Sequence, residues 1–351
     1  MEELYHIGID IHRKFLVVAV LDEEGELLEM KRIEVGAREF LKEYFSCFPE
    51  GTPVVIEATS GWEWVNDLLE ECGKEVKLAN PHKVKLIAEA TIKTDKIDAC
   101  VLAHLERTNF LPLSYIPPKQ VREYRELLRH RIRLVRVKTS LKNRVHSILT
   151  RMGILHEGIT DLFGKRGREF LANLELPGQY KKSIEDYLEL IESLEGYIKE
   201  IEKEIKRILK GELKEEAEIL MSVCGISYFS ALLLSAEIGD IERFSSAKKL
   251  CSYAGLAPTT TQSGEKMYHG HLKRDSNKYI KWVLLEAVEH LIKKDKAIGY
   301  RYYKKMRSKG KNKARVMVAQ KLCRSIYAML KHREGYQELR KRMAKKIRVS
   351  P

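Results

Sequence analysis

The first 110 residues alternate short apolar runs with amphipathic stretches, and this alternation restricts the chain to a small set of α/β folds. Three apolar runs come first, joined by turns that are short enough for antiparallel hairpins. Later runs are separated by helical patterns, as in a sheet with helices packed on it. The predicted strands are 5–10, 15–21, 27–34, 53–58 and 75–79, and the predicted helices are 38–45, 62–72, 82–90 and 98–107. The order βββαβαβα predicts a mixed sheet whose first three strands form an antiparallel meander.

Four acidic residues occupy positions in this pattern where an unpaired carboxylate is unfavourable. Asp10 ends the first apolar run and Glu57 ends the fourth, so both follow buried strand segments. Asp95 and Asp98 are spaced i, i+3 at the start of a predicted helix, which places them on one face. Taken alone, Asp10 is better explained as a solvated turn residue, and only the set of four predicts a site. Acids that converge from two strands and a helix suit two divalent cations for phosphodiester chemistry. Hard oxygen ligands favour Mg²⁺, with Mn²⁺ as the alternative.

The chain is basic, and its charge is unevenly distributed. It has 64 Lys and Arg against 50 Asp and Glu, a formal net charge of +14. Segment 119–151 carries 11 Lys and Arg against two acids, and segment 301–348 carries 18 against two. A polyanionic partner is expected, although charge alone does not separate DNA, RNA and an acidic membrane surface. Basic helices that serve only solubility are the simpler alternative.

Cysteine usage and hydropathy exclude several classes of protein. The six cysteines are scattered without a CxxC pair, which disfavours a zinc site or a disulfide framework. The acidic start of the chain does not resemble a signal peptide, and no apolar stretch approaches the roughly 20 residues of a membrane span. We therefore predict a protein of the reducing cytoplasm with no membrane partner.

Prolines at 112, 117 and 118 end the alternating pattern, and the rest of the chain is predicted to be mainly helical. A basic helix over 119–152 precedes a heptad pattern in which apolar residues recur at alternating steps of 3 and 4. Its members are Ile184, Tyr187, Ile191, Leu194, Ile198, Ile201, Ile205 and Ile208. Either the basic helix or a second protomer could fill this coiled-coil seam. The predicted domains are 1–112, 113–214 and 215–351.

Three features are predicted in the C-terminal domain. Residues 221–238 resemble a helix–hairpin–helix, whose glycine turn can offer N–H groups to a phosphate, although a plain helix connection explains them as well. Residues 255–281 are predicted to form a polar loop, which overlaps the start of a helix over 278–294. A basic tail over 301–348 follows.

Five segments, in collinear order, resemble a single known family. They are Gly8-Ile9-Asp10, Ile56-Glu57-Ala58-Thr59-Ser60-Gly61, Asn80-Pro81, Lys93-Thr94-Asp95-Lys96-Ile97-Asp98-Ala99 and Tyr253-Ala254-Gly255-Leu256-Ala257-Pro258. The family is that of the DEDD transposases of bacterial and archaeal insertion sequences, relatives of the Piv DNA invertases. The resemblance implies a RuvC-like (RNase H-fold) mixed-sheet catalytic domain, a helical coiled-coil region and a mainly helical C-terminal transposase domain.

The resemblance also implies roles for individual residues. The family's metal-binding tetrad falls on Asp10, Glu57, Asp95 and Asp98, and its catalytic serine falls on Ser263. It implies recombination through a covalent phosphoserine link to DNA, guided by a structured RNA from the element. It further implies a homo-oligomer, dimer or tetramer, with an active site shared between protomers. Nucleic-acid contacts are predicted at Arg129, Arg133, Arg136, Lys142, Arg144, Arg274 and Lys281.

The chain departs from the family pattern after Ser263. Ser276 replaces the usual glycine and Lys281 the usual arginine, and a lysine does not reproduce the bidentate phosphate grip of arginine. Ser276 and Thr261 are the alternative nucleophiles. The rival functions are a metal-dependent nuclease or junction resolvase that uses water, and a nucleic-acid-binding protein whose acids are structural. The C-terminal domain could also serve only as a helical oligomerisation module.

Overall fold

A computed structural model of the chain describes residues 4–87, 94–211, 213–263, 266–273 and 275–349. The chain divides into two compact units, Met1–Ile116 and Pro117–Pro351. Within the described ranges, no helix is long and apolar enough to cross a membrane. The predicted division at 112 and 214 stays a prediction.

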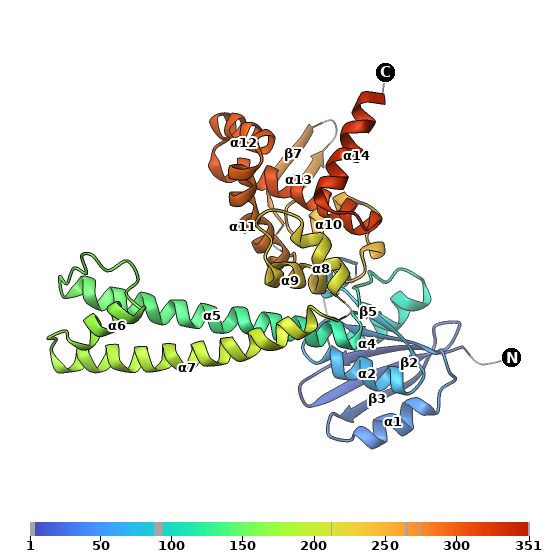
Figure 1. Cartoon of the computed structure of the whole chain (residues 1–351). Helices are drawn as coiled ribbons and strands as arrows, with labels where there is room; N and C mark the ends of the chain where they lie inside the picture. Colours follow the sequence, from blue (N-terminus) through green and yellow to red (C-terminus); the bar gives the residue numbers. More distant parts are fainter. Residues whose placement is uncertain (1–3, 88–93, 212, 264–265, 274, 350–351) are drawn as a thin grey trace. The chain divides into compact units, whose positions relative to one another are not determined.

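The first unit contains a five-stranded mixed sheet in the order β3-β2-β1-β4-β5 (Figure 1). Its elements are β1 (His6–Ile11), β2 (Phe15–Leu21), β3 (Leu27–Glu34), α1 (Arg38–Ser46), β4 (Pro53–Glu57), α2 (Trp62–Glu71), β5 (Glu75–Ala79), α3 (Pro81–Ile87) and α4 (Asp95–Arg107). Strands β1, β2 and β3 form the predicted antiparallel meander, while β4 lies parallel to both β1 and β5. The expected mixed α/β arrangement is therefore confirmed.

Helices cover both faces of this sheet. Leu41 and Phe45 of α1 and Leu69 of α2 pack in one cluster with Ile9 of β1 and other strand residues. On the opposite face, Ala99 of α4 packs with β2 side chains, and Leu102 packs with residues of β4, β5 and α3. Because β1 and β4 are central and covered on both sides, their sequences are almost uniformly apolar up to their last residues.

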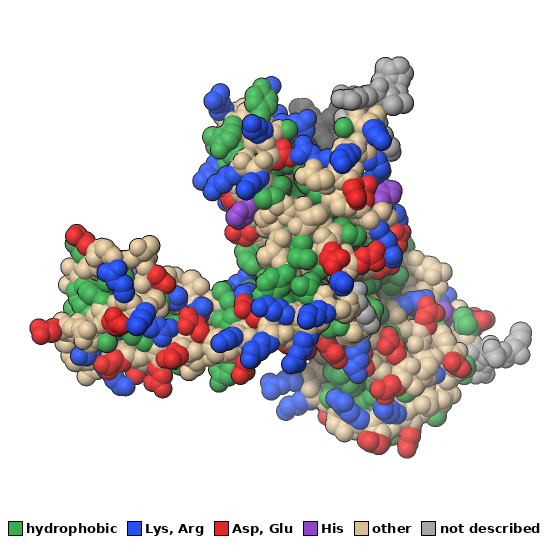
Figure 2. All heavy atoms as spheres, viewed as in Figure 1, with side chains coloured by type: hydrophobic (Ala, Val, Ile, Leu, Met, Phe, Trp, Pro, Cys, Tyr) green, Lys and Arg blue, Asp and Glu red, His purple; other side chains and the backbone are tan. Residues whose placement is uncertain are grey.

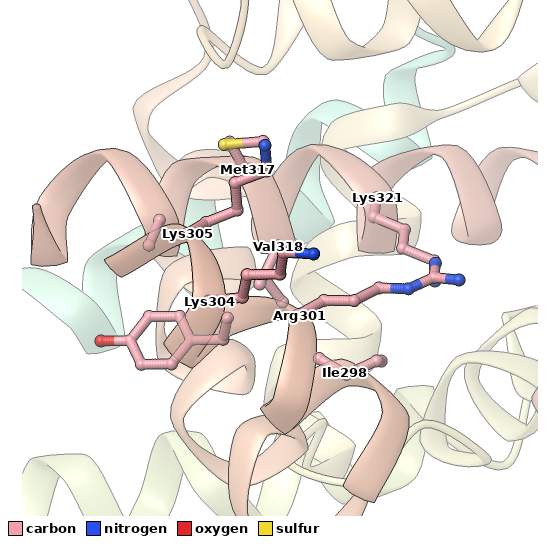
Figure 3. A pocket seen from close by; sticks show the side chains of 9 residues that line it. Ile298, Arg301, Lys304, Lys305, Met317, Val318 and Lys321 are labelled. Atoms are coloured by element: carbon pink, nitrogen blue, oxygen red, sulfur yellow. The ribbon is translucent and has the colours of Figure 1, made fainter. Parts of the chain in front are cut away.

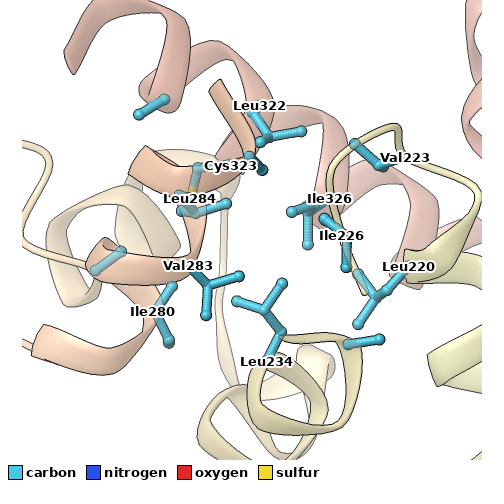
Figure 4. Packing of buried hydrophobic residues seen from close by; sticks show 14 of the residues in the cluster. Leu220, Val223, Ile226, Leu234, Ile280, Val283, Leu284, Leu322, Cys323 and Ile326 are labelled. Atoms are coloured by element: carbon cyan, nitrogen blue, oxygen red, sulfur yellow. The ribbon is translucent and has the colours of Figure 1, made fainter. Parts of the chain in front are cut away.

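The second unit is mainly helical. Its elements are α5 (Lys119–Arg151), α6 (Lys165–Ala172), α7 (Gly178–Ile208), α8 (Lys214–Met221), α9 (Tyr228–Ile238), η1 (Ile241–Arg243), α10 (Ala247–Tyr253), β6 (Pro258–Ser263), β7 (Lys266–Leu272), α11 (Lys278–Lys294), α12 (Lys296–Lys309), α13 (Lys311–His332) and α14 (Tyr336–Val349). Its main core packs α8, α9, α11 and α13 together through residues such as Leu220, Leu234, Leu284 and Ile326 (Figure 4).

The predicted heptad lies on α7, where its buried residues recur at intervals of seven. They are Ile184, Ile191, Ile198 and Ile205. Helix α5 packs along α7, with Val145 and Ile148 in the cluster that holds Ile184 and Ile191 (Figure 1). The basic helix of the same chain therefore fills at least part of the seam.

The prediction of a loop over 255–281 is wrong for much of that range. Strands β6 and β7 form a two-stranded antiparallel sheet, with Pro258 opposite Leu272 and Ser263 opposite Lys266. The sequence did not predict them because the first strand is a run of polar residues, Thr259-Thr260-Thr261-Gln262-Ser263, in which no apolar alternation appears.

Candidate active site

Two predicted acids lie at neighbouring strand ends. Strands β1 and β4 are parallel and pair Ile9 with Ile56, so Asp10 and Glu57 come next on each strand at the same edge of the sheet. The Asp10 side chain is 18% exposed, and Glu57 is half-buried. This register makes Asp10 and Glu57 neighbours on adjacent strands.

Helix α4 brings the other two acids toward this edge. Its first residue is Asp95, and the side chain of Thr94 caps the helix by accepting a hydrogen bond from the Ile97 N–H at 3.4 Å. Asp98 lies one turn further along and is half-buried. The helix lies directly against β1 because Gly8 has no side chain: a Cβ there would lie 2.1 Å from the Ala99 carbonyl oxygen.

The other end of α4 is fixed by a buried polar cluster. Glu106, only 5% exposed, contacts the ring of His6 on β1 and accepts a hydrogen bond from Lys77 on β5 at 2.8 Å. A carboxylate buried to this degree is favourable only when it is paired. This cluster therefore holds the helix against two strands and supports the position of Asp95.

His12 completes the acidic group, and sequence reasoning missed it. Its Nε2 lies 3.0 Å from Asp10 Oδ2 and 3.3 Å from Asp95 Oδ2, so one imidazole touches a strand acid and a helix acid. The ring packs against Phe15 at 4.5 Å, and the His12 N–H donates to the Phe15 carbonyl in the tight β1–β2 turn. The only available signal was its place two residues after Asp10.

Burial and mutual repulsion disfavour the charged form of Asp10. Desolvation raises the pKa of Asp10, His12 lowers it, and the negative charges of Asp98 and Asp95 raise it further. The net shift is upward. A bound cation would stabilise these carboxylates in their ionised form, as metal binding does wherever it competes with protons for a ligand.

The donor set fits a divalent metal ion. Ligand atoms of Asp10, His12 and Asp95 lie within 4.8 Å of one another. Carboxylate oxygens suit Mg²⁺ and Mn²⁺, and an imidazole nitrogen adds affinity for transition metals. Glu57 and Asp98 lie at the same strand edge and on the same helix start, where they could add oxygen ligands.

The predicted serine lies in the second unit. Ser263 is the last residue of β6, and its side chain falls outside the described side chains, as does that of Thr261. The alternative nucleophile Ser276 has its hydroxyl in hydrogen-bonding contact with the Lys273 carbonyl at 3.3 Å. A Cβ atom on Gly255 would lie only 2.2 Å from that hydroxyl oxygen, so the Ser276 side chain packs directly against Gly255.

The predicted nucleic-acid contacts have different surroundings. Arg129 donates to both carboxylate oxygens of Glu237 at 2.7 and 2.8 Å, and Glu237 is fully buried. Arg133 pairs with Glu126, and the Lys142 ammonium lies 4.6 Å from the centre of the Phe163 ring.

The remaining predicted contact residues differ in how exposed they are to solvent. Arg136 and Arg144 are exposed on α5, and Lys281 is half-buried on α11. Arg274 lies outside the described residues. Among the predicted contacts on α5, Arg136 and Arg144 are therefore the best placed to meet a polyanion.

Comparison with known proteins identifies the family. One family model, DEDD_Tnp_IS110, described as transposase, matches residues 7–154. A second, described as transposase of the IS116/IS110/IS902 family, matches residues 217–304. The chain belongs to this transposase family. The resemblance inferred from the motifs is thus confirmed, and the two matches include Asp10 to Asp98 and Ser263.

Relatives that match most of this chain support the same family assignment. The transposase is 26% identical to the transposase for insertion sequence element IS1111A of Coxiella burnetii, over 96% of this chain and 92% of the relative. It is 26% identical to the transposase for IS1328 of Yersinia enterocolitica, over 80% and 82% of the two chains. It is also 27% identical to the pilin gene-inverting protein of Moraxella bovis, over 81% of each. Membership of a DEDD family is consistent with divalent-metal dependence, which the Asp10, His12 and Asp95 ligand atoms fit.

Proposed function

We propose that this transposase cuts and rejoins DNA with a metal site formed by Asp10, Glu57, Asp95 and Asp98, and with Ser263 as the nucleophile. The observation that carries the metal site is the contact of one His12 nitrogen with both Asp10 and Asp95, from a strand end and a helix start. The mixed sheet, with acids at the ends of two adjacent central strands, supports an RNase H-like assignment for this unit.

In the proposed reaction, the Ser263 Oγ–phosphorus bond forms as the bond from phosphorus to a deoxyribose oxygen breaks. The serine proton passes to water and the released deoxyribose oxygen takes up a proton, so charge and atoms balance. Attack by a strand-end hydroxyl on the phosphoserine then reverses these bonds and frees the serine. Bound divalent ions would supply positive charge for the phosphate oxygens. Ser263 is favoured over Ser276 because the Ser276 hydroxyl is packed at Gly255 and bonded to Lys273.

The proposed partners are donor and target DNA and a structured guide RNA from the element. Exposed Arg136 and Arg144 on α5, together with the basic helices α12 to α14, support a polyanionic partner. A homo-oligomer, dimer or tetramer, would combine the acids of one protomer with the serine of another.

The test is a denaturing gel of purified protein with Mg²⁺, flanking RNA and labelled DNA carrying the element junction. We expect a protein-linked DNA band that is absent in both the Ser263→Ala and the Asp10→Asn variants. Ser276→Ala is the matched control and should retain the band. A band lost only in Ser276→Ala would move the nucleophile to that residue.

The alternative is a metal-dependent nuclease or resolvase in which water attacks. It requires the same acids but no serine, and the acidic group of the first unit would suffice for it. Cleavage without a covalent band, retained in Ser263→Ala, would establish this alternative. Unchanged activity in Asp10→Asn would instead indicate that the acids are structural.

A further inference from the structure

A pocket between α12 and α13 combines an apolar floor with a basic mouth (Figure 3). Ile298, Tyr302, Ala314 and Val318 form the floor, and the cavity measures about 290 Å³. Small-molecule sites begin at roughly 300 Å³, so this volume suits one flat ring system better than a large ligand.

Four cations surround the opening: Arg301, Lys304, Lys305 and Lys321. None of them forms an ion pair within 4.0 Å of an acid in the described ranges, whereas the neighbouring Arg315 pairs with Glu289. Figure 3 shows Arg301 of α12 and Lys321 of α13 pointing to the same side of the pocket. Burial lowers the pKa of Lys321, the positive charge of Arg301 lowers it further, and the negative charge of Asp295 raises it.

Helix α12 also carries aromatic side chains that do not line the pocket. Tyr300 is 70% exposed, and Tyr303, whose ring packs edge-on against Tyr302 of the pocket at 5.2 Å, is 50% exposed. On the face shown in Figure 2, hydrophobic side chains and Lys or Arg side chains are interleaved over α12. Basic surfaces interleaved with aromatic rings bind unpaired nucleotides by stacking and by phosphate attraction.

We propose that the α12–α13 pocket binds one unpaired nucleotide of a single-stranded nucleic acid, with the base on the apolar floor and adjacent phosphates on the four cations. Unpaired bases suit such a site because their faces and edges are free to leave the stack. The inference rests on the proposed function only in that the transposase acts on nucleic acid; it requires neither Ser263 nor a metal.

The test measures binding of fluorescent oligo-dT and oligo-U, each about 12 nucleotides long, by anisotropy without divalent metal. The Lys304→Ala/Lys321→Ala variant removes two pocket cations. The matched control, Lys309→Ala/Lys311→Ala, removes the same charge from exposed positions on the same helices that do not line the pocket. Since each lost phosphate contact on a single strand changes the slope of log affinity against log salt by about 0.7, we expect the pocket variant to lose about 1.4. The control should keep the wild-type slope.

Insertion of the base is tested separately with 4-thiouridine in the oligonucleotide. Photocrosslinks should map to Tyr302 or Met317, and an abasic oligonucleotide should bind more weakly than its intact counterpart. The preference between oligo-dT and oligo-U identifies DNA or RNA as the source of the nucleotide. Equal slope changes in both double variants, crosslinks only outside α12 and α13, or tighter binding of an acidic peptide would overturn the proposal. Because no cleavage is measured, failure of the covalent-adduct test leaves this result interpretable.

Discussion

A Cβ atom on Gly8 would lie 2.1 Å from the carbonyl oxygen of Ala99 and 2.7 Å from the backbone nitrogen of Ala103. Both atoms belong to α4, so the absence of a side chain on β1 sets how closely this helix approaches the sheet. The same helix begins with Asp95. The glycine two residues before Asp10 is therefore a structural requirement of the acidic site as well as part of a sequence motif.

Gly8→Ala should displace α4 and destabilise the protein, since the clash is with backbone that cannot rotate away. Overpacking of this kind costs typically 1–3 kcal/mol, and we expect the upper end. Denaturant unfolding measures the loss, and calorimetry with Mn²⁺ should show weaker metal binding. Gly196→Ala is the matched control: a Cβ on Gly196, within α7, would meet nothing within 4 Å, so this variant should gain about 0.5–1 kcal/mol.

Asp10→Asn should stabilise the metal-free protein at neutral pH and abolish its stabilisation by metal. Burial raises the pKa of Asp10 above its ordinary value of 3.8, so over the window above 3.8 the folded protein holds a proton that the unfolded chain has lost. The contribution of Asp10 to the free energy of unfolding therefore falls as the pH rises through that window. The Asp10→Asn side chain does not titrate, so this loss of stability is absent from the variant. Thermal unfolding against pH, with and without Mg²⁺, is the measurement. A pH profile of stability that is the same in the Asp10→Asn variant and the wild type would contradict this prediction.

His12→Ala should alter which metal the site prefers. An imidazole nitrogen beside two carboxylates favours Mn²⁺ over Mg²⁺ more than oxygen ligands alone do. We expect the affinity for Mn²⁺ to fall about 10-fold or more, the range seen for groups that support a metal site, with a smaller change for Mg²⁺. Isothermal titration with each metal decides this. Equal losses for both metals would mean that His12 only positions Asp10 and Asp95.

Arg129→Ala should destabilise the fold rather than weaken nucleic-acid binding alone. It would leave the buried Glu237 carboxylate without its bidentate partner. Breaking a buried pair costs about 3–5 kcal/mol, and we expect the lower end because Asn277 at 2.7 Å and Arg125 at 3.9 Å remain beside Glu237. Exposed Arg136→Ala should change stability by less than about 0.5 kcal/mol while reducing the salt dependence of DNA binding. Comparable stability of the two variants would assign Arg129 to the nucleic-acid surface instead.

Much of the first unit was predictable because its apolar runs are bounded by turn residues. Strands Phe15–Leu21, Leu27–Glu34 and Glu75–Ala79 have the predicted bounds, and α4 begins at Asp95, three residues before its predicted start. In contrast, the sequence of the β6–β7 hairpin carries no apolar alternation. Its polar sequence is locally indistinguishable from that of a loop.

Local patterns were enough to predict the family and most of the secondary structure, because periodicity and residue chemistry act over a few neighbouring positions. The pairing of distant groups depended on the tertiary structure. Packing of α4 on Gly8 brings Asp95 to His12, and packing of α5 on α9 places Arg129 on Glu237. Each of these pairs joins segments about 80 to 110 residues apart in the sequence. Such contacts require closure of a long loop, and the residues next to each partner do not encode which distant segment it will meet.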